Sequence, residues 1–159
     1  MSSPIRAIVA TALMLSALTT ALVEARAAPV NPPKSVPKIT GVTQSSNAAA
    51  LAAQLVGPGV TISNAQFFGA NNPAGTFVGG QACVGIDTGV VLSTGFAEDV
   101  RGPNTSDSWS EIMNTAGDLQ LDALVAPETT FDAAILQFDV TPVANTIAIR
   151  FVFASEEYP

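Results

Sequence analysis

The sequence predicts a mainly β domain, a β-sandwich or jelly-roll-like fold with one short N-terminal helix. Five short segments rich in Val, Ile, Phe and Thr are separated by Gly, Pro, Asn and Asp, a pattern typical of strands joined by turns. Only one alanine-rich segment has helical length, and no internal repeat is evident. This distribution favours two packed sheets over a helical or alternating α/β fold. A chain of 159 residues is long enough for one domain with a modest core.

The elements are expected in a simple order. Ser46 or Asn47 caps a helix that runs to Leu55, and the Gly-Pro-Gly sequence at 57–59 ends it. A long polar stretch, residues 96–132, separates the third strand from the fourth and contains one helical turn at "DLQLDALV". A connection of this length is usually functional or partly disordered. The five strands are "VTISNAQFF" (60–68), "AGTFVG" (74–79), "GVVLSTG" (89–95), "AAILQFDV" (133–140) and "TIAIRFVFA" (146–154).

Residues 1–27 have the pattern of a secretory signal peptide. Arg6 gives a positive start, the apolar run "AIVATALMLSALTTALV" follows, and small residues precede a cleavage site between Ala27 and Ala28. An uncleaved membrane anchor is the alternative, but Ser and Thr interrupt the run. We expect a Pro-rich linker at 28–45, the folded domain at 46–159, and no membrane span in the mature chain. The protein should be exported, to the extracellular space or the cell surface.

Composition excludes several classes of function. The net charge is −7, and only six residues are Lys or Arg, so the chain cannot neutralise a nucleic-acid backbone. There is no histidine, which removes Ser-His-Asp relays and His-ligated metals. Any catalysis would have to use carboxylates. We expect the one cysteine, Cys83, to be a small buried side chain, because no cation is near it in sequence to lower its pKa.

Several motifs occur in an order that resembles the choice-of-anchor L domain family of bacterial exported proteins. They are "LVGPGVTISNAQFFGANNPAGTF", "GIDTGVVLSTG", "GPN", "GDLQLDAL", "TTFDAAILQFDVTP" and "IRFVFASEEYP", and the resemblance covers residues 47–159. The resemblance implies a non-catalytic domain that lies upstream of varied anchoring signals. It also implies that more strands follow "SEEYP". We therefore expect this chain to be a fragment, incomplete at the C-terminal side of the domain.

The carboxylates suggest two kinds of site. Asp118 and Asp122 are four residues apart and share a face if helical, and with Glu156 they could bind calcium. A helix N-cap is the alternative role for Asp118. Glu156 could instead belong to a carboxylate-based hydrolase that acts on glycans. Its neighbour Glu157 points to the opposite face of a strand, so the two cannot flank one bond.

Arg150 is a lone cation inside the fifth expected strand. If strands 133–140 and 146–154 form an antiparallel hairpin, matching of the apolar faces pairs Val140 with Ile147. Asp139 is then the diagonal neighbour of Arg150, and we expect a structural ion pair between them.

These observations predict a secreted or surface-displayed structural or binding module that is not an enzyme, with calcium as the candidate cofactor. A calcium-dependent adhesin that binds carbohydrate or matrix is the alternative within the binding class. Its expected partners are extracellular matrix, glycans or surface proteins, and not nucleic acid.

Export should remove the N-terminus. Mass spectrometry of the mature protein is expected to find Ala28 as the first residue. An intact Met1 in a membrane fraction would contradict the signal-peptide interpretation.

Overall fold

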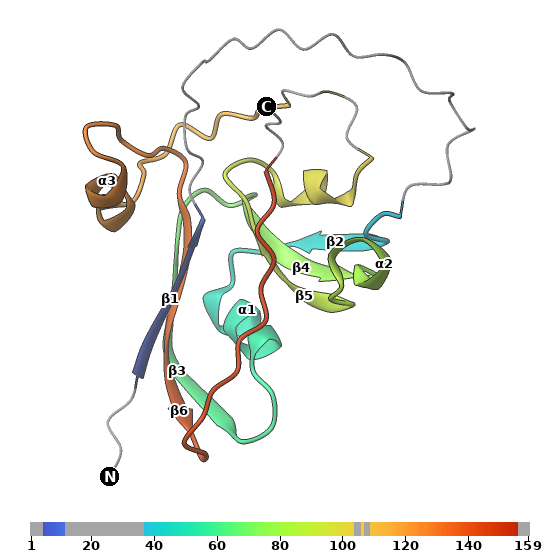
Figure 1. The fold of residues 1–159 in the computed structure, drawn as a ribbon, viewed down its shortest axis with the longest axis vertical. Helices are drawn as coiled ribbons and strands as arrows, with labels where there is room; N and C mark the ends of the chain where they lie inside the picture. Colours follow the sequence, from blue (N-terminus) through green and yellow to red (C-terminus); the bar gives the residue numbers. More distant parts are fainter. Residues whose placement is uncertain (1–4, 12–36, 104–105, 107–108, 156–159) are drawn as a thin grey trace, which may run out of the picture.

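A computed structural model describes residues 5–11, 37–103, 106 and 109–155, and within them the chain forms two three-stranded antiparallel sheets (Figure 1). The first sheet has the order β1-β6-β3 and the second the order β2-β4-β5. The predicted mainly β class is confirmed. The elements are β1 (Ile5–Thr11), β2 (Gly41–Gln44), α1 (Ala48–Leu55), β3 (Val60–Phe68), β4 (Ala74–Val78), α2 (Gln81–Val84), β5 (Thr88–Leu92), the 3-10 helix η1 (Ala97–Arg101), α3 (Leu119–Val125) and β6 (Ala134–Pro142).

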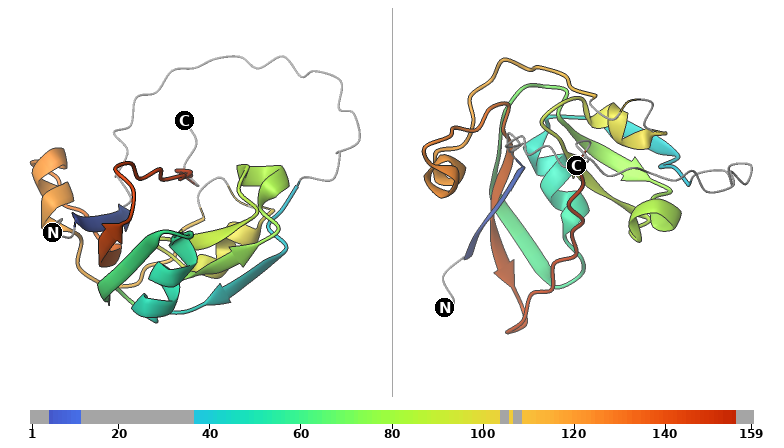
Figure 2. Two further views of the ribbon diagram at one scale, coloured as in Figure 1. Left: turned by 90° about the horizontal axis from the view of Figure 1, so that it is seen from below. Right: turned by 45° about the horizontal axis from the view of Figure 1, so that its top comes forward.

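Helix α1 starts at the predicted cap and supplies part of the core. The Asn47 side chain accepts a hydrogen bond from the backbone N–H of Ala50 at 3.1 Å, which satisfies one of the free donors of the first turn. On its buried face, Leu51 and Ala52 are completely inaccessible to solvent. They pack with inward residues of both sheets, so α1 lies against the first sheet and also touches the second (Figure 2). The buried members of this cluster are Leu51, Ala52, Ala74, Leu136, Phe138 and Val140.

Strand β6 is the middle strand of the first sheet and alternates strictly. Leu136, Phe138 and Val140 are buried against α1, and the intervening Gln137 and Asp139 are half-buried on the other face. This is the period-2 pattern of a strand with one face in the core. Its two edges are both paired, with β1 on one side and β3 on the other.

The second sheet begins earlier than the sequence suggested. Strand β2 pairs with β4, and Ile39 just before it is buried, so the folded part reaches into the range predicted as linker. Four residues are too few to show a period-2 pattern. Opposite β2, a Cβ atom on Gly75 would lie 2.5 Å from the carbonyl oxygen of Thr43, so only glycine allows this close approach.

The expected strands at 60–68, 74–79, 89–95 and 133–140 correspond to β3, β4, β5 and β6, but residues 146–154 do not form a strand. After β6 the chain runs back toward the second sheet, where Arg150 donates a hydrogen bond to the Gly85 carbonyl oxygen at 2.8 Å (Figure 1). Asp139 accepts one from Asn64. The hairpin and the Arg150–Asp139 ion pair are thus not formed in this structure, because β1 and β3 occupy both edges of β6.

Two further segments differ from expectation. Ile5–Thr11, inside the predicted signal peptide, forms β1. Its partner residues on β6 run from Val140 to Ala134. Cys83 is exposed, so the prediction of a buried side chain was wrong. It lies on α2, a single helical turn that has no buried residue.

Loss of the Leu136 side chain, at the centre of the core, should lower the stability of the domain. Leu136 is fully buried, and Leu136→Ala is expected to lower the free energy of unfolding by about 3 kcal/mol, through lost burial and the cavity left behind. The matched control is Leu124→Ala, because Leu124 is 80% exposed and its truncation should change stability by no more than about 0.5 kcal/mol. Urea unfolding of the two variants measures both values. Equal effects would contradict this placement of the core.

Candidate functional site

A β-bulge in β3 shapes the outer face of the first sheet. Ser63 pairs with Asp139 and Gln66 with Gln137, so three residue steps on β3 face two on β6. The extra residue lets the inward positions change from Val60 and Ile62 to Ala65 and Phe67, so these four side chains all pack against the core. Asn64 within the bulge has a φ of 53°, a left-handed conformation that asparagine tolerates better than most residues.

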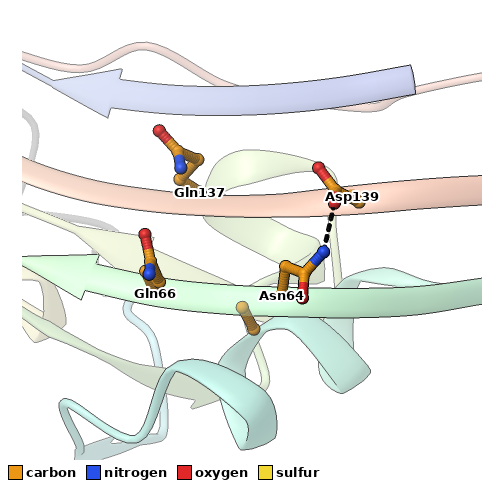
Figure 3. Close-up of a pocket in the computed structure, with 5 residues that line it drawn as sticks. Asn64, Gln66, Gln137 and Asp139 are labelled. Carbon is orange, nitrogen blue, oxygen red and sulfur yellow. Dashed lines mark hydrogen bonds between the residues drawn. The ribbon is translucent and has the colours of Figure 1, made fainter. Parts of the chain in front are cut away.

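The bulge brings polar side chains of β3 and β6 together on the face away from α1. The Asn64 side-chain N–H donates to Asp139 Oδ2 at 2.6 Å, and this hydrogen bond fixes both side chains (Figure 3). Gln66 and Gln137 lie beside them on neighbouring strands. These four residues and Ala65 line a shallow, open groove of about 350 Å³. We call it the polar groove.

The polar groove has hydrogen-bonding capacity that the protein does not use. Within the described part of the chain, the side-chain amides of Gln66 and Gln137 have no hydrogen-bond partner. Each amide can donate and accept at once. Two residues further along β3, Phe68 pairs with Ile135, and Phe68 is 49% exposed. The arrangement combines paired amides, one carboxylate and a flanking aromatic ring.

The predicted calcium ligands Asp118 and Asp122 lie in the loop between β5 and β6, and both have structural roles. Asp118 caps α3 by accepting hydrogen bonds from the backbone N–H groups of Gln120 and Leu121, at 2.9 and 3.0 Å. Asp122 accepts from the backbone N–H of Thr130 at 2.6 Å and from its hydroxyl at 2.7 Å.

Glu156, the third expected ligand, lies outside the described residues. Within them, no group of three or more Asp, Glu, Cys or His side chains could hold a metal ion. Calcium stays a prediction.

Sequence reasoning missed Asp132, which holds the other side of the same loop. Its carboxylate accepts hydrogen bonds from the backbone N–H groups of Met113 and Thr115, at 3.1 and 2.7 Å. Just beside it, Ala116 and Phe131 form an isolated β-bridge. The aspartate immediately before an apolar strand was a readable signal, since such residues often accept from backbone N–H groups in turns. Two aspartates therefore close this loop: Asp122 through its hydrogen bonds with Thr130, and Asp132 just before β6.

The predicted cleavage site at Ala27 and Ala28 lies outside the described residues. None of the helices in the described ranges is long and apolar enough to cross a membrane.

Stability at low pH should depend on Asp122. Hydrogen bonds from the Thr130 backbone N–H and then the Thr130 hydroxyl lower the pKa of Asp122 below its ordinary value of 3.8. A folded-state pKa below the unfolded one stabilises the fold above the unfolded value, and this stability is lost as pH falls through the folded value. Asp122→Asn should therefore show a shallower loss of unfolding free energy between about pH 5 and pH 2 than the wild type.

Urea unfolding across this pH range measures the difference. The matched control is Asp87→Asn, since Asp87 is exposed and its carboxylate accepts no hydrogen bond from any described residue. If the unfolding free energy of Asp122→Asn fell with pH as steeply as that of the wild type, the assigned hydrogen bonds would be contradicted.

Comparison with known proteins agrees with the motifs and the fold. The chain matches the family described as Choice-of-anchor L domain over residues 39–159, which includes every element from β2 to β6. No curated protein and no solved structure matches it. The matched range begins at the buried Ile39, two residues before the second sheet starts at Gly41. The family indicates a bacterial surface-associated module and is not known as enzymatic. The chain belongs to the Choice-of-anchor L domain family.

Proposed function

We propose that this domain is an exported, non-catalytic module that binds a neutral, hydroxyl-rich polysaccharide along the polar groove. The observation that carries the proposal is the pair of amides of Gln66 and Gln137, register partners on β3 and β6 that have no hydrogen-bond partner among the described residues. A sugar hydroxyl both donates and accepts a hydrogen bond, and so does a side-chain amide. The carboxylate of Asp139, oriented by Asn64, adds a fixed acceptor beside them.

Charge and shape favour a glycan over other ligands. The chain carries a net charge of −7, which disfavours polyanions. The lining residues whose side chains the structure describes include no cation. The exposed ring of Phe68 offers an apolar face on which the C–H side of a sugar ring can rest. The groove is open and shallow, as suits an extended chain of sugars more than an enclosed small molecule.

The groove is better suited to binding than to hydrolysis. Glycoside hydrolysis generally needs two carboxyl groups that flank the bond, about 5–10 Å apart. Asp139 is the only carboxylate among the described residues that line the groove, and its Oδ2 already accepts from Asn64. The described residues of the polar groove therefore do not supply both the acid and the base that glycoside hydrolysis needs.

The test is binding to a glycan array, followed by titration of the best ligand. Gln66→Ala/Gln137→Ala should weaken binding about tenfold, because two hydrogen bonds of roughly 0.5–1.5 kcal/mol each are lost. The matched control is Thr43→Ala/Thr76→Ala, a register pair in the second sheet, which should bind as the wild type does.

Two outcomes would contradict the proposal, and a third tests the calcium prediction. Unchanged binding by the glutamine variant would remove the polar groove as the site. Release of reducing ends from the bound glycan would replace binding by hydrolysis. Arrays run with calcium and with chelator also test the calcium prediction from Asp118, Asp122 and Glu156. Identical binding in both would show that calcium is not required.

A further inference from the structure

The edge of β6 that faces away from β3 is paired with β1 in the 159-residue chain. The register places Ile5, Ala7 and Val9 opposite Val140, Phe138 and Leu136. These three β6 residues carry the buried face of the first sheet. The occupant of this edge therefore also covers one side of the core.

A second segment of the same chain also has the sequence pattern of a strand. Residues 147–153 follow β6 after a short bend at 143–145, and they have no strand partner among the residues that the structure describes. Their apolar side chains are open to solvent, with Ile149 72%, Phe151 82% and Phe153 71% exposed. Exposed apolar side chains on an extended, unpaired backbone are unfavourable, and they usually indicate a missing partner.

We propose that this edge of β6 is a strand-acceptor site and that residues 147–153 are its second occupant, in competition with β1. A bend of three residues suits a hairpin connection. The register that places Ile147 opposite Val140 also places Ile149 opposite Phe138 and Phe151 opposite Leu136. Partners across a ladder share a face, so these side chains would move from solvent to the core side.

The exchange is favoured by the side chains involved. At the position opposite Phe138, Ala7 is replaced by Ile149, and opposite Leu136, Val9 is replaced by Phe151. Both replacements bring a larger apolar side chain to the core face, and burial stabilises roughly in proportion to apolar area. If the predicted signal peptide is cleaved after Ala27, β1 leaves and residues 147–153 become the occupant.

The experiment measures backbone amide hydrogen exchange in the full chain, produced without export. Ala7→Pro/Ile8→Pro should displace β1, because proline has no N–H and one of two consecutive residues must donate toward β6. Amides 147–153 should then gain protection by about tenfold or more, while amides of β6 and of the β4–β5 pair stay protected. The matched control is Ala27→Pro/Ala28→Pro, two prolines outside β1, which should leave amides 147–153 unprotected.

A second pair of variants tests the identity of the new occupant. Adding Ile149→Asp/Phe151→Asp to the displaced chain should abolish the gained protection. Adding Leu119→Asp/Leu124→Asp, at equally exposed residues of α3 (85% and 80%), should leave it in place. In the wild type neither aspartate pair should unfold the protein, because all four side chains are exposed.

Three results would overturn the proposal. The first is that β1 is displaced but amides 147–153 gain no protection from hydrogen exchange. The second is global unfolding of the Ala7→Pro/Ile8→Pro chain, since a replacement strand should prevent it. The third is protection that rises with protein concentration, because the edge would then be filled by a second copy. Glycan binding takes no part in these measurements, so they are independent of the proposed function.

Discussion

The packing of one face of β6 against helix α1 is the constraint on which the rest of this domain depends. Leu136 and Leu51 are both completely buried where the two elements meet, and Phe138 and Val140 extend the contact along the strand. A one-residue slip of β6 would turn its buried side chains, Leu136, Phe138 and Val140, to solvent. The pairing register of the neighbouring strands is therefore fixed by the core, and the composition of the outer face follows from it.

The bulge in β3 is the clearest case of the core setting the surface. The apolar residues of β3 change parity between Ile62 and Ala65, and a regular strand would have exposed one half of them. One extra residue resolves the mismatch, and Asn64 is turned toward Asp139 as a result. Bulges commonly re-aim side chains near binding sites, and here the same device leaves two glutamine amides side by side.

Local signals were readable in the sequence, and long-range ones were not. The bounds of β3 and the caps Asn47 and Asp118 follow from short-range chemistry, and the structure has all three. The bulge was not predicted, although the change of parity in "VTISNAQFF" is a local signal for it. Strand β2 was missed because four residues give no period. Residues 146–154 have every local property of a strand, but pairing depends on which distant segment holds the edge of β6, and local pattern carries no information on that. Predicting the polar groove would have required the β3–β6 register, and the hydrophobic pattern of either strand alone does not determine that register.

The exposed position of Cys83 has a practical consequence. The chain has no other cysteine, so a maleimide dye would attach at a single place without any engineering. That place is on α2, two residues before the carbonyl group of Gly85 that accepts from Arg150. A fluorophore there would sense the C-terminal segment through its emission, and spectroscopy on the unmodified sequence could follow the docking and release of that segment in real time.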